Sequence, residues 1–246
     1  MDKTIFNQRK MKTKEIKVMQ IRIKVYVLRD ISVERIQAEM AAFLDQGLVR
    51  DVRFAELHQT NQFKGYCYDL LYPVEQGKVY KKGGIYTLTI RTIDLELARY
   101  FATQAVNVYT QAVKALTAEV KVIPQKPIEL LYTLTPVILK CGEKGFWRDT
   151  LSVEQYEERL KVNLLKKWRQ FYGEKLPEDF ELFMGIEFLN KVPIKVKYKN
   201  IHLLGDKLRL YIAGNETAQN LAQMAIGVGA GEMNSRGMGF CNHHWL

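Results

Sequence analysis

The hydrophobic and polar positions in the first half of the chain follow two different periods. Residues 16–28 (IKVMQIRIKVYVL) alternate polar with apolar side chains, which predicts a strand. Residues 32–47 place apolar side chains at helical spacing, so we predict a helix with Ser32 as its N-cap and Gly47 as its C-cap. The remaining predicted elements of this half are strands at about 49–57, 65–72 and 84–92, a helix opening at Asp94 and a strand over 118–124.

The second half repeats this order of elements. A strand is predicted within residues 128–139, and a helix follows from the capping box formed by Ser152 and Gln155. The later elements are strands at about 192–200 and 207–213, a helix at about 216–226 and a last strand over 238–245. Each half has the order β-α-β-β-α-β. We therefore predict an α+β fold of two tandem ferredoxin-like (βαββαβ, RRM-like) domains, residues 1–123 and 128–246, joined by a proline-containing segment.

The composition of the chain indicates in which cellular compartment the protein is expected. With 246 residues, of which 47% are hydrophobic, the chain can bury a sizeable core. No run approaches the roughly 20 apolar residues of a membrane span, and the charged N-terminus lacks the apolar region of a signal peptide. Three scattered cysteines, Cys67, Cys141 and Cys241, suit neither a disulfide framework nor a paired zinc site. We expect a cytoplasmic protein with no membrane association.

The charge balance suggests a polyanionic partner. The chain has 37 Lys and Arg against 27 Asp and Glu, a net charge of +10. Lys195, Lys197 and Lys199 recur at strand spacing and would share one face, where they could follow a phosphate backbone. A solvated edge strand, on which lysines discourage unwanted pairing, is an equally good interpretation.

A glycine-rich stretch, GVGAGEMNSRGMGF, covers residues 227–240. Dinucleotide-binding and P-loop motifs need a helix after the glycines, whereas here a helix precedes them and a strand follows. Gly227 is well placed as a left-handed C-cap of that helix. Arg236 lies among glycines that let a ligand approach main-chain amides, and apolar neighbours anchor the loop. We expect the loop to contact phosphate.

The glycine stretch, the central TPVIL strand and the helix NLLKKWRQFYG resemble the CRISPR-associated endoribonucleases of Cas family six, in the RAMP superfamily. The resemblance covers nearly the whole chain and implies cleavage of precursor CRISPR RNA. Non-catalytic RNA-binding Cas subunits share this fold and similar glycine loops, so the loop alone does not establish catalysis.

Histidine is the natural general base for RNA cleavage near neutral pH, and the chain has four: His58, His202, His243 and His244. A polar turn separates His58 from Lys64, so imidazole and ammonium could converge on one phosphate. The resemblance supports this pair, because the family commonly has a histidine after the first helix and a lysine a few residues later. Many members also have a tyrosine in the first helix, where this chain has Phe43; that role is absent, filled by Lys64, or supplied by Tyr66 or Tyr68.

These observations predict a metal-independent endoribonuclease that cleaves CRISPR repeats by 2′-hydroxyl attack, leaving 2′,3′-cyclic phosphate and 5′-hydroxyl ends, with no cofactor. The alternatives are a non-catalytic RNA-binding subunit of a CRISPR effector complex and a small-molecule enzyme. The expected partners are the CRISPR repeat transcript and other Cas subunits, and the expected state is a monomer or homodimer. The candidate catalytic residues are His58 and Lys64. The candidate RNA-binding residues are Gly227, Gly229, Gly231, Ser235, Arg236, Gly237, Gly239, Lys195, Lys197 and Lys199.

Overall fold

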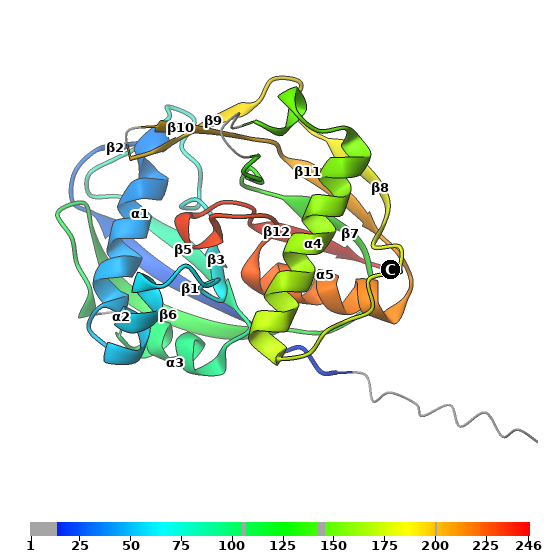
Figure 1. The fold of residues 1–246 in the computed structure, drawn as a ribbon. Helices are drawn as coiled ribbons and strands as arrows, with labels where there is room; N and C mark the ends of the chain where they lie inside the picture. The colour runs from blue at the N-terminus through cyan, green and yellow to red at the C-terminus, as the bar shows by residue number, and fades with distance from the viewer. Residues whose placement is uncertain (1–13, 105–106, 142–145, 200) are drawn as a thin grey trace, which may run out of the picture.

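The computed structural model describes residues 14–104, 107–141, 146–199 and 201–246. In this part of the chain, two halves lie side by side, each built on a four-stranded antiparallel sheet (Figure 1). The elements of the first half are β1 (Val18–Val27), β2 (Ile31–Ser32), α1 (Val33–Leu48), α2 (Val52–Gln59), β3 (Tyr66–Tyr68), β4 (Val79–Tyr80), β5 (Ile85–Thr92), α3 (Leu95–Gln104) and β6 (Val113–Ile123). Those of the second half are β7 (Ile128–Thr133), the short helix η3 (Trp147–Asp149), α4 (Val153–Tyr172), β8 (Phe183–Phe188), β9 (Ile194–Tyr198), β10 (Ile201–Gly205), β11 (Leu208–Ile212), α5 (Glu216–Val228), η4 (Asn234–Arg236) and β12 (Cys241–Trp245).

Both sheets have the same strand order. It is β3-β5-β1-β6 in the first half and β12-β7-β11-β8 in the second. In each half the first strand is flanked by the third and the fourth, and the second strand lies at an edge. One helix follows the first strand and another follows the third, as the βαββαβ order requires. The prediction of two tandem ferredoxin-like folds is confirmed. The segment 123–127, predicted as the boundary, starts at the last residue of β6 and ends directly before β7.

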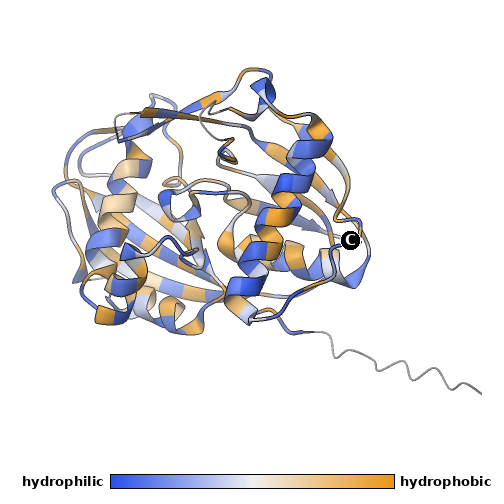
Figure 2. Cartoon of the chain, in the orientation of Figure 1, coloured by the Kyte–Doolittle hydropathy of each residue, from blue (hydrophilic) through white to orange (hydrophobic). Residues whose placement is uncertain are grey.

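Side chains at alternate positions of β1 form part of the hydrophobic core of the first half. Ile21, Ile23 and Val25 of β1 are fully buried, whereas Lys24 between them is exposed. The buried side chains pack against the apolar face of α1, which includes Ile36. Figure 2 shows hydrophilic and hydrophobic residues alternating along α1 and α4, as expected of helices with one buried face.

The three predicted helix starts are confirmed; Ser32 is the N-cap residue of α1, although its side chain makes no capping hydrogen bond. The Asp94 carboxylate accepts hydrogen bonds from the first turn of α3, and Ser152 and Gln155 form the predicted capping box of α4. The predicted C-cap at Gly47 is wrong, because α1 continues to Leu48. The Gly47 carbonyl instead accepts a hydrogen bond from the Tyr100 hydroxyl at 2.7 Å.

The strand prediction at 192–200 needs a correction. The second strand of the second sheet is β8, which the sequence pattern missed because Gly185 interrupts a short, half-exposed edge strand. The predicted strand is β9, which pairs only with β10 in a separate hairpin. Figure 1 shows this hairpin, hereafter the β9–β10 hairpin, reaching from the second half to α1 of the first.

The two halves are joined by buried contacts. Arg91 of β5 is 5% exposed and donates hydrogen bonds to the Cys241 carbonyl (2.5 Å) and to Asn242 Oδ1 (3.0 Å) of β12. Gly227 lies within α5, where a Cβ would come within 2.6 Å of Ile93 in the first half. Gly227 is therefore not the predicted left-handed cap; α5 is capped at Gly229, which has a φ of 79°. None of the helices in the described segments is long and apolar enough to cross a membrane.

Candidate functional site

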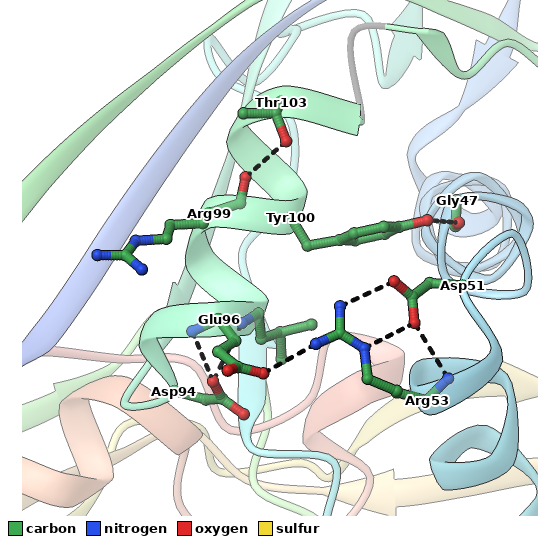
Figure 3. A network of polar contacts seen from close by, with 9 residues as sticks. Gly47, Asp51, Arg53, Asp94, Glu96, Arg99, Tyr100 and Thr103 are labelled. Atoms are coloured by element: carbon green, nitrogen blue, oxygen red, sulfur yellow. Dashed lines mark hydrogen bonds and ion pairs between the residues drawn. The ribbon is translucent and has the colours of Figure 1, made fainter.

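The segment that carries His58 is a helix, so the predicted strand at 49–57 is wrong. Asp51 is the N-cap of α2, and its carboxylate accepts a hydrogen bond from Arg53 N. The Arg53 guanidinium also contacts Asp51 and reaches Glu96 of α3 at 3.1 Å (Figure 3). This network fixes α2 against α3. His58 occupies the last turn of α2; its side chain lies outside the described part of the structure.

Lys64 turns back onto the end of α2. Its Nζ donates hydrogen bonds to the carbonyl oxygens of Leu57 and of Thr60, the latter at 2.6 Å. Leu57 directly precedes His58, so the ammonium group of Lys64 lies close to the backbone of His58. Burial lowers the pKa of Lys64, the positive charge of Arg236 lowers it further, and the Asp45 carboxylate opposes both.

Helix α4 of the second half holds the turn that precedes Lys64. The Gln170 side chain donates to the Phe63 carbonyl (2.7 Å) and accepts from the Phe63 amide (2.9 Å). One amide side chain thus satisfies both backbone groups of a residue next to Lys64. The position of Lys64 is in this way coupled to the second half.

The same helix holds the loop over residues 229–239, hereafter the glycine loop, which lies between α1 and α4 (Figure 1, red). Lys167 is 1% exposed, and its Nζ donates to Gly229 O, Gly231 O and Asn234 Oδ1, each at 2.7 Å. Asn234 in turn donates to two other carbonyl oxygens of the loop. Burial lowers the pKa of Lys167 to about 7. A buried lysine side chain therefore organises the interior of the glycine loop.

Tight backbone geometry explains the glycines of this loop. Gly229, Gly231, Gly237 and Gly239 all have positive φ, and a Cβ at Gly239 would lie 1.9 Å from the Ala230 carbonyl oxygen. The amides of Gly229, Gly237 and Gly239 donate to carbonyl oxygens of Ala225, Asn234 and Pro136. These three amides are therefore occupied by acceptors within the protein, and the glycines shape the loop; contact of the loop with phosphate stays a prediction.

Arg236 connects the glycine loop to the first half. Its guanidinium contacts the Asp45 carboxylate of α1 at 2.5 Å. Burial opposes the Arg236 charge, but the hydrogen bond and negative charge of Asp45 keep its pKa above the ordinary value. Ser235 beside it is partly exposed. The loop thus contacts the first half through Arg236.

A cavity of about 500 Å³ lies where these pieces meet, hereafter the interdomain pocket. Its lining includes the 60–66 segment, the inner face of α4 and the glycine loop. Five lining residues are basic, namely Lys64, Lys140, Lys166, Lys167 and Arg236, and only Glu232 among the lining residues is acidic. Such a concentration of positive charge favours an anion such as a phosphodiester.

Lys195, Lys197 and Lys199 take the predicted arrangement only in part. Lys195 and Lys197 are exposed on β9 with Val196 buried between them, as strand alternation requires. Lys199 follows the strand in the turn of the hairpin, with a φ of 52°. The three lysines are therefore not on one strand face, although all three belong to the β9–β10 hairpin region.

The remaining histidines lie away from the interdomain pocket lining. His202 is exposed on β10, and His243 and His244 lie in β12, as the sequence predicts for the last strand. Burial lowers the pKa of His243 to about 4, so it is neutral at neutral pH. The His244 ring stacks on Tyr132 with centroids 5.2 Å apart.

Neither Phe43 nor the nearby tyrosines provides an obvious third catalytic group. Phe43 is 1% exposed in the core of the first half, so it is not at the pocket. Tyr66 borders the pocket, whereas the Tyr68 hydroxyl donates to the Gln37 carbonyl at 3.0 Å. Burial raises the pKa of both tyrosines, so neither is a phenolate at neutral pH.

Sequence reasoning missed Lys167 and Gln170. It interpreted the apolar face of α4 as core alone. One signal was available: Lys167 lies at helical spacing between Leu164 and Phe171, on the face that should be buried. A lysine in such a position needs polar partners inside the protein.

Comparison with known proteins agrees with this fold. Residues 118–243 match the family model described as CRISPR associated protein Cas6, C-terminal. A curated relative, the CRISPR-associated endoribonuclease Cas6 2 of Methanocaldococcus jannaschii, is 24% identical over 243 aligned residues, covering 91% of this chain and 99% of the relative.

Two solved structures resemble nearly the whole chain. One, described as a RAMP protein binding different RNA substrates, has a TM-score of 0.69 at 18% identity and covers 92% of this chain and 99% of its own. The other comes from a Cas6-related gene of Pyrococcus furiosus, with a TM-score of 0.65 at 18% identity, covering 92% and 98%. Both likenesses concern the fold.

Proposed function

The chain belongs to the Cas6 family of CRISPR-associated proteins, and from this premise we propose that it is an endoribonuclease that cleaves precursor CRISPR RNA within each repeat. The observation that carries the proposal is the interdomain pocket. It gathers cations from both halves beside the end of α2, where His58 lies. A basic cavity of this kind suits the phosphodiester of an RNA strand.

The proposed reaction uses the nucleophile that RNA itself contains. His58 takes the proton of the 2′-hydroxyl, and the 2′-oxygen attacks the adjacent phosphorus. The bond from phosphorus to the 5′-oxygen breaks, that oxygen takes a proton from water, and His58 returns its proton to the solvent. The products have a 2′,3′-cyclic phosphate and a 5′-hydroxyl, and the step needs no metal ion.

Lys64 and Arg236 supply positive charge in this proposal. Lys64 is held against the end of α2 by two carbonyl oxygens, close to the backbone of His58. A cation fixed there stabilises the negative charge that develops on the phosphorane oxygens. Arg236 lies in the same pocket, fixed by Asp45, and helps to bind the phosphate.

The RNA strand is proposed to follow the glycine loop and the β9–β10 hairpin. Ser235 and Arg236 contact the backbone from the loop, whose shape depends on Gly229, Gly231, Gly237 and Gly239, and Gly227 lets α5 pack closely against the first half at the start of this loop. Lys195, Lys197 and Lys199 extend the positive surface along the hairpin.

The proposal is tested by incubating the protein with repeat RNA in EDTA. We expect one cut per repeat, with cyclic phosphate and 5′-hydroxyl ends. A single 2′-deoxy substitution at the scissile nucleotide should abolish that cut while leaving binding within about twofold. Continued cutting of the 2′-deoxy RNA would exclude the proposed nucleophile, and binding without any cleavage would favour the non-catalytic RNA-binding subunit.

A further inference from the structure

A second cavity, of about 330 Å³, adjoins the interdomain pocket. It lies between α1 and the β9–β10 hairpin and is hereafter the α1 groove. Its volume is at the lower end of the range for small-molecule sites. Three residues, Tyr198, Met233 and Arg236, line both cavities, so the two lie next to each other.

Small and apolar side chains form the walls of the α1 groove. On α1, the exposed Ala38 and Ala42 leave space where larger side chains would fill it. Val196 and Leu203 of the hairpin form the opposite wall, and Met238 of the glycine loop adds to the lining. A concave apolar surface beside a charged site is typical of a binding site for a flat organic group.

Aromatic and basic side chains border the same groove. Tyr198 is partly exposed, and Lys199 Nζ lies 5.7 Å from the centre of its ring. Lys197 and Arg236 also contribute to the lining. The aromatic face and the apolar walls of the groove suit an uncharged ring of a ligand. The cations beside them suit a negatively charged group attached to that ring.

Unusual backbone conformations occur in the lining of the α1 groove. Among the described residues, three non-glycine residues have positive φ, and two of them, Lys199 (52°) and Met233 (61°), line the α1 groove. Such conformations are uncommon outside glycine and concentrate at ligand-binding and active sites.

We propose that the α1 groove binds an unpaired nucleobase of the nucleotide beside the scissile phosphate, stacked on Tyr198. The inference rests on the proposed function, because it places the phosphate of the same strand in the interdomain pocket. A nucleotide combines the two groups that the neighbouring cavities suit, a flat ring and an anion. Bases stack on aromatic side chains with little dependence on sequence. We therefore expect the groove to require an unpaired base but to discriminate little between the four bases.

The test is RNA binding under conditions that prevent cleavage. Repeat RNA with a 2′-deoxy scissile nucleotide is titrated with wild-type protein, intact or with one abasic site on either side of the scissile phosphate. One of the two abasic sites should weaken wild-type binding about tenfold or more. Ala42→Leu, which fills the groove from an exposed helix position, should weaken binding of intact RNA to a similar extent and be insensitive to that abasic site.

Two further variants make the result decisive. Ala102→Leu, the same change on α3 outside the groove lining, should bind as the wild type does, and Tyr198→Ala should also lose sensitivity to the abasic site. The groove proposal is overturned if the abasic site weakens wild type and Ala42→Leu equally, or if Ala42→Leu binds intact RNA like the wild type. Cleavage of unmodified RNA is measured separately: a protein that binds with the predicted pattern but does not cut would contradict the nuclease proposal and support the groove.

Discussion

At the scale of single residues, the environment of Lys64 determines the pH range over which it can act. Its pKa is lowered by burial and by Arg236, so the cation is lost as the pH rises through a value below the ordinary 10.5. Cleavage should therefore decline on the alkaline side earlier than an unperturbed lysine would allow.

Substitution of Lys64 tests this expectation. Lys64→Ala should reduce the single-turnover cleavage rate about 100-fold, because the charge developing on the phosphorane loses its nearest fixed cation. Lys64→Arg should retain more activity and move the alkaline decline to higher pH, since arginine stays protonated. Lys140→Ala, which removes an exposed cation from the same pocket, should weaken RNA binding without moving that decline. Cleavage by Lys64→Ala at the wild-type rate across the pH range would contradict the proposed role.

Local patterns predicted some residues of the site and not others. The interval between His58 and Lys64 is short, so a turn that brings them together can be inferred from sequence; their catalytic roles stay predictions. The bonds from Lys167 to the glycine loop span more than 60 positions in the chain. No local pattern records such a contact, because it depends on how α4 packs against the end of α5.

At the scale of elements, α4 positions both segments that border the interdomain pocket. Lys167 fixes the glycine loop, and Gln170 fixes the turn before Lys64. Lys167→Met should leave three buried acceptors without their donor and lower the free energy of unfolding by about 1–3 kcal/mol. Denaturant titration measures this, with Lys166→Met, its exposed neighbour on α4, as a control that should change little. Equal stability of the two variants would contradict the role assigned to Lys167.

The effect of Lys167→Met should also depend on pH. Burial lowers the pKa of Lys167 to about 7 in the folded protein, against an ordinary value of 10.5. Between these values the unfolded chain binds more protons than the folded one, so this group adds stability as the pH rises from about 7 toward 10.5. The stability difference between wild type and Lys167→Met should therefore widen over that window, by up to about 1.4 kcal/mol per pH unit.

Helices and strands were predicted correctly where the hydrophobic periodicity was regular. The predictions failed where tertiary contacts determine the secondary structure or the pairing of a strand. The alternation in β1 and the capping box of α4 are strong local signals, and both elements form as expected. Helix α2 has only 8 residues and a weak apolar pattern, and its anchoring by Arg53 to Glu96 of α3 spans 43 positions. The β9–β10 hairpin has strand periodicity, but periodicity does not tell which sheet a strand joins.

At the scale of the whole molecule, the two ferredoxin-like halves follow from the order of elements, whereas the site between them does not. Arg91 joins the sheets, Arg236 joins the glycine loop to α1, and Gln170 joins α4 to the turn before Lys64. Each of these contacts crosses from one half to the other. The domain boundaries at 123 and 128 stay a prediction.

The proposed reaction places RNA cleavage in the interdomain pocket, with His58 as the general base. Its most direct test is the single-turnover cleavage rate of repeat RNA in EDTA by His58→Ala, measured beside the wild type and His202→Ala. We predict that His58→Ala cleaves about 100-fold more slowly or less while binding the RNA normally, and that His202→Ala cleaves at the wild-type rate. Cleavage by His58→Ala at the wild-type rate would show that His58 is not the general base.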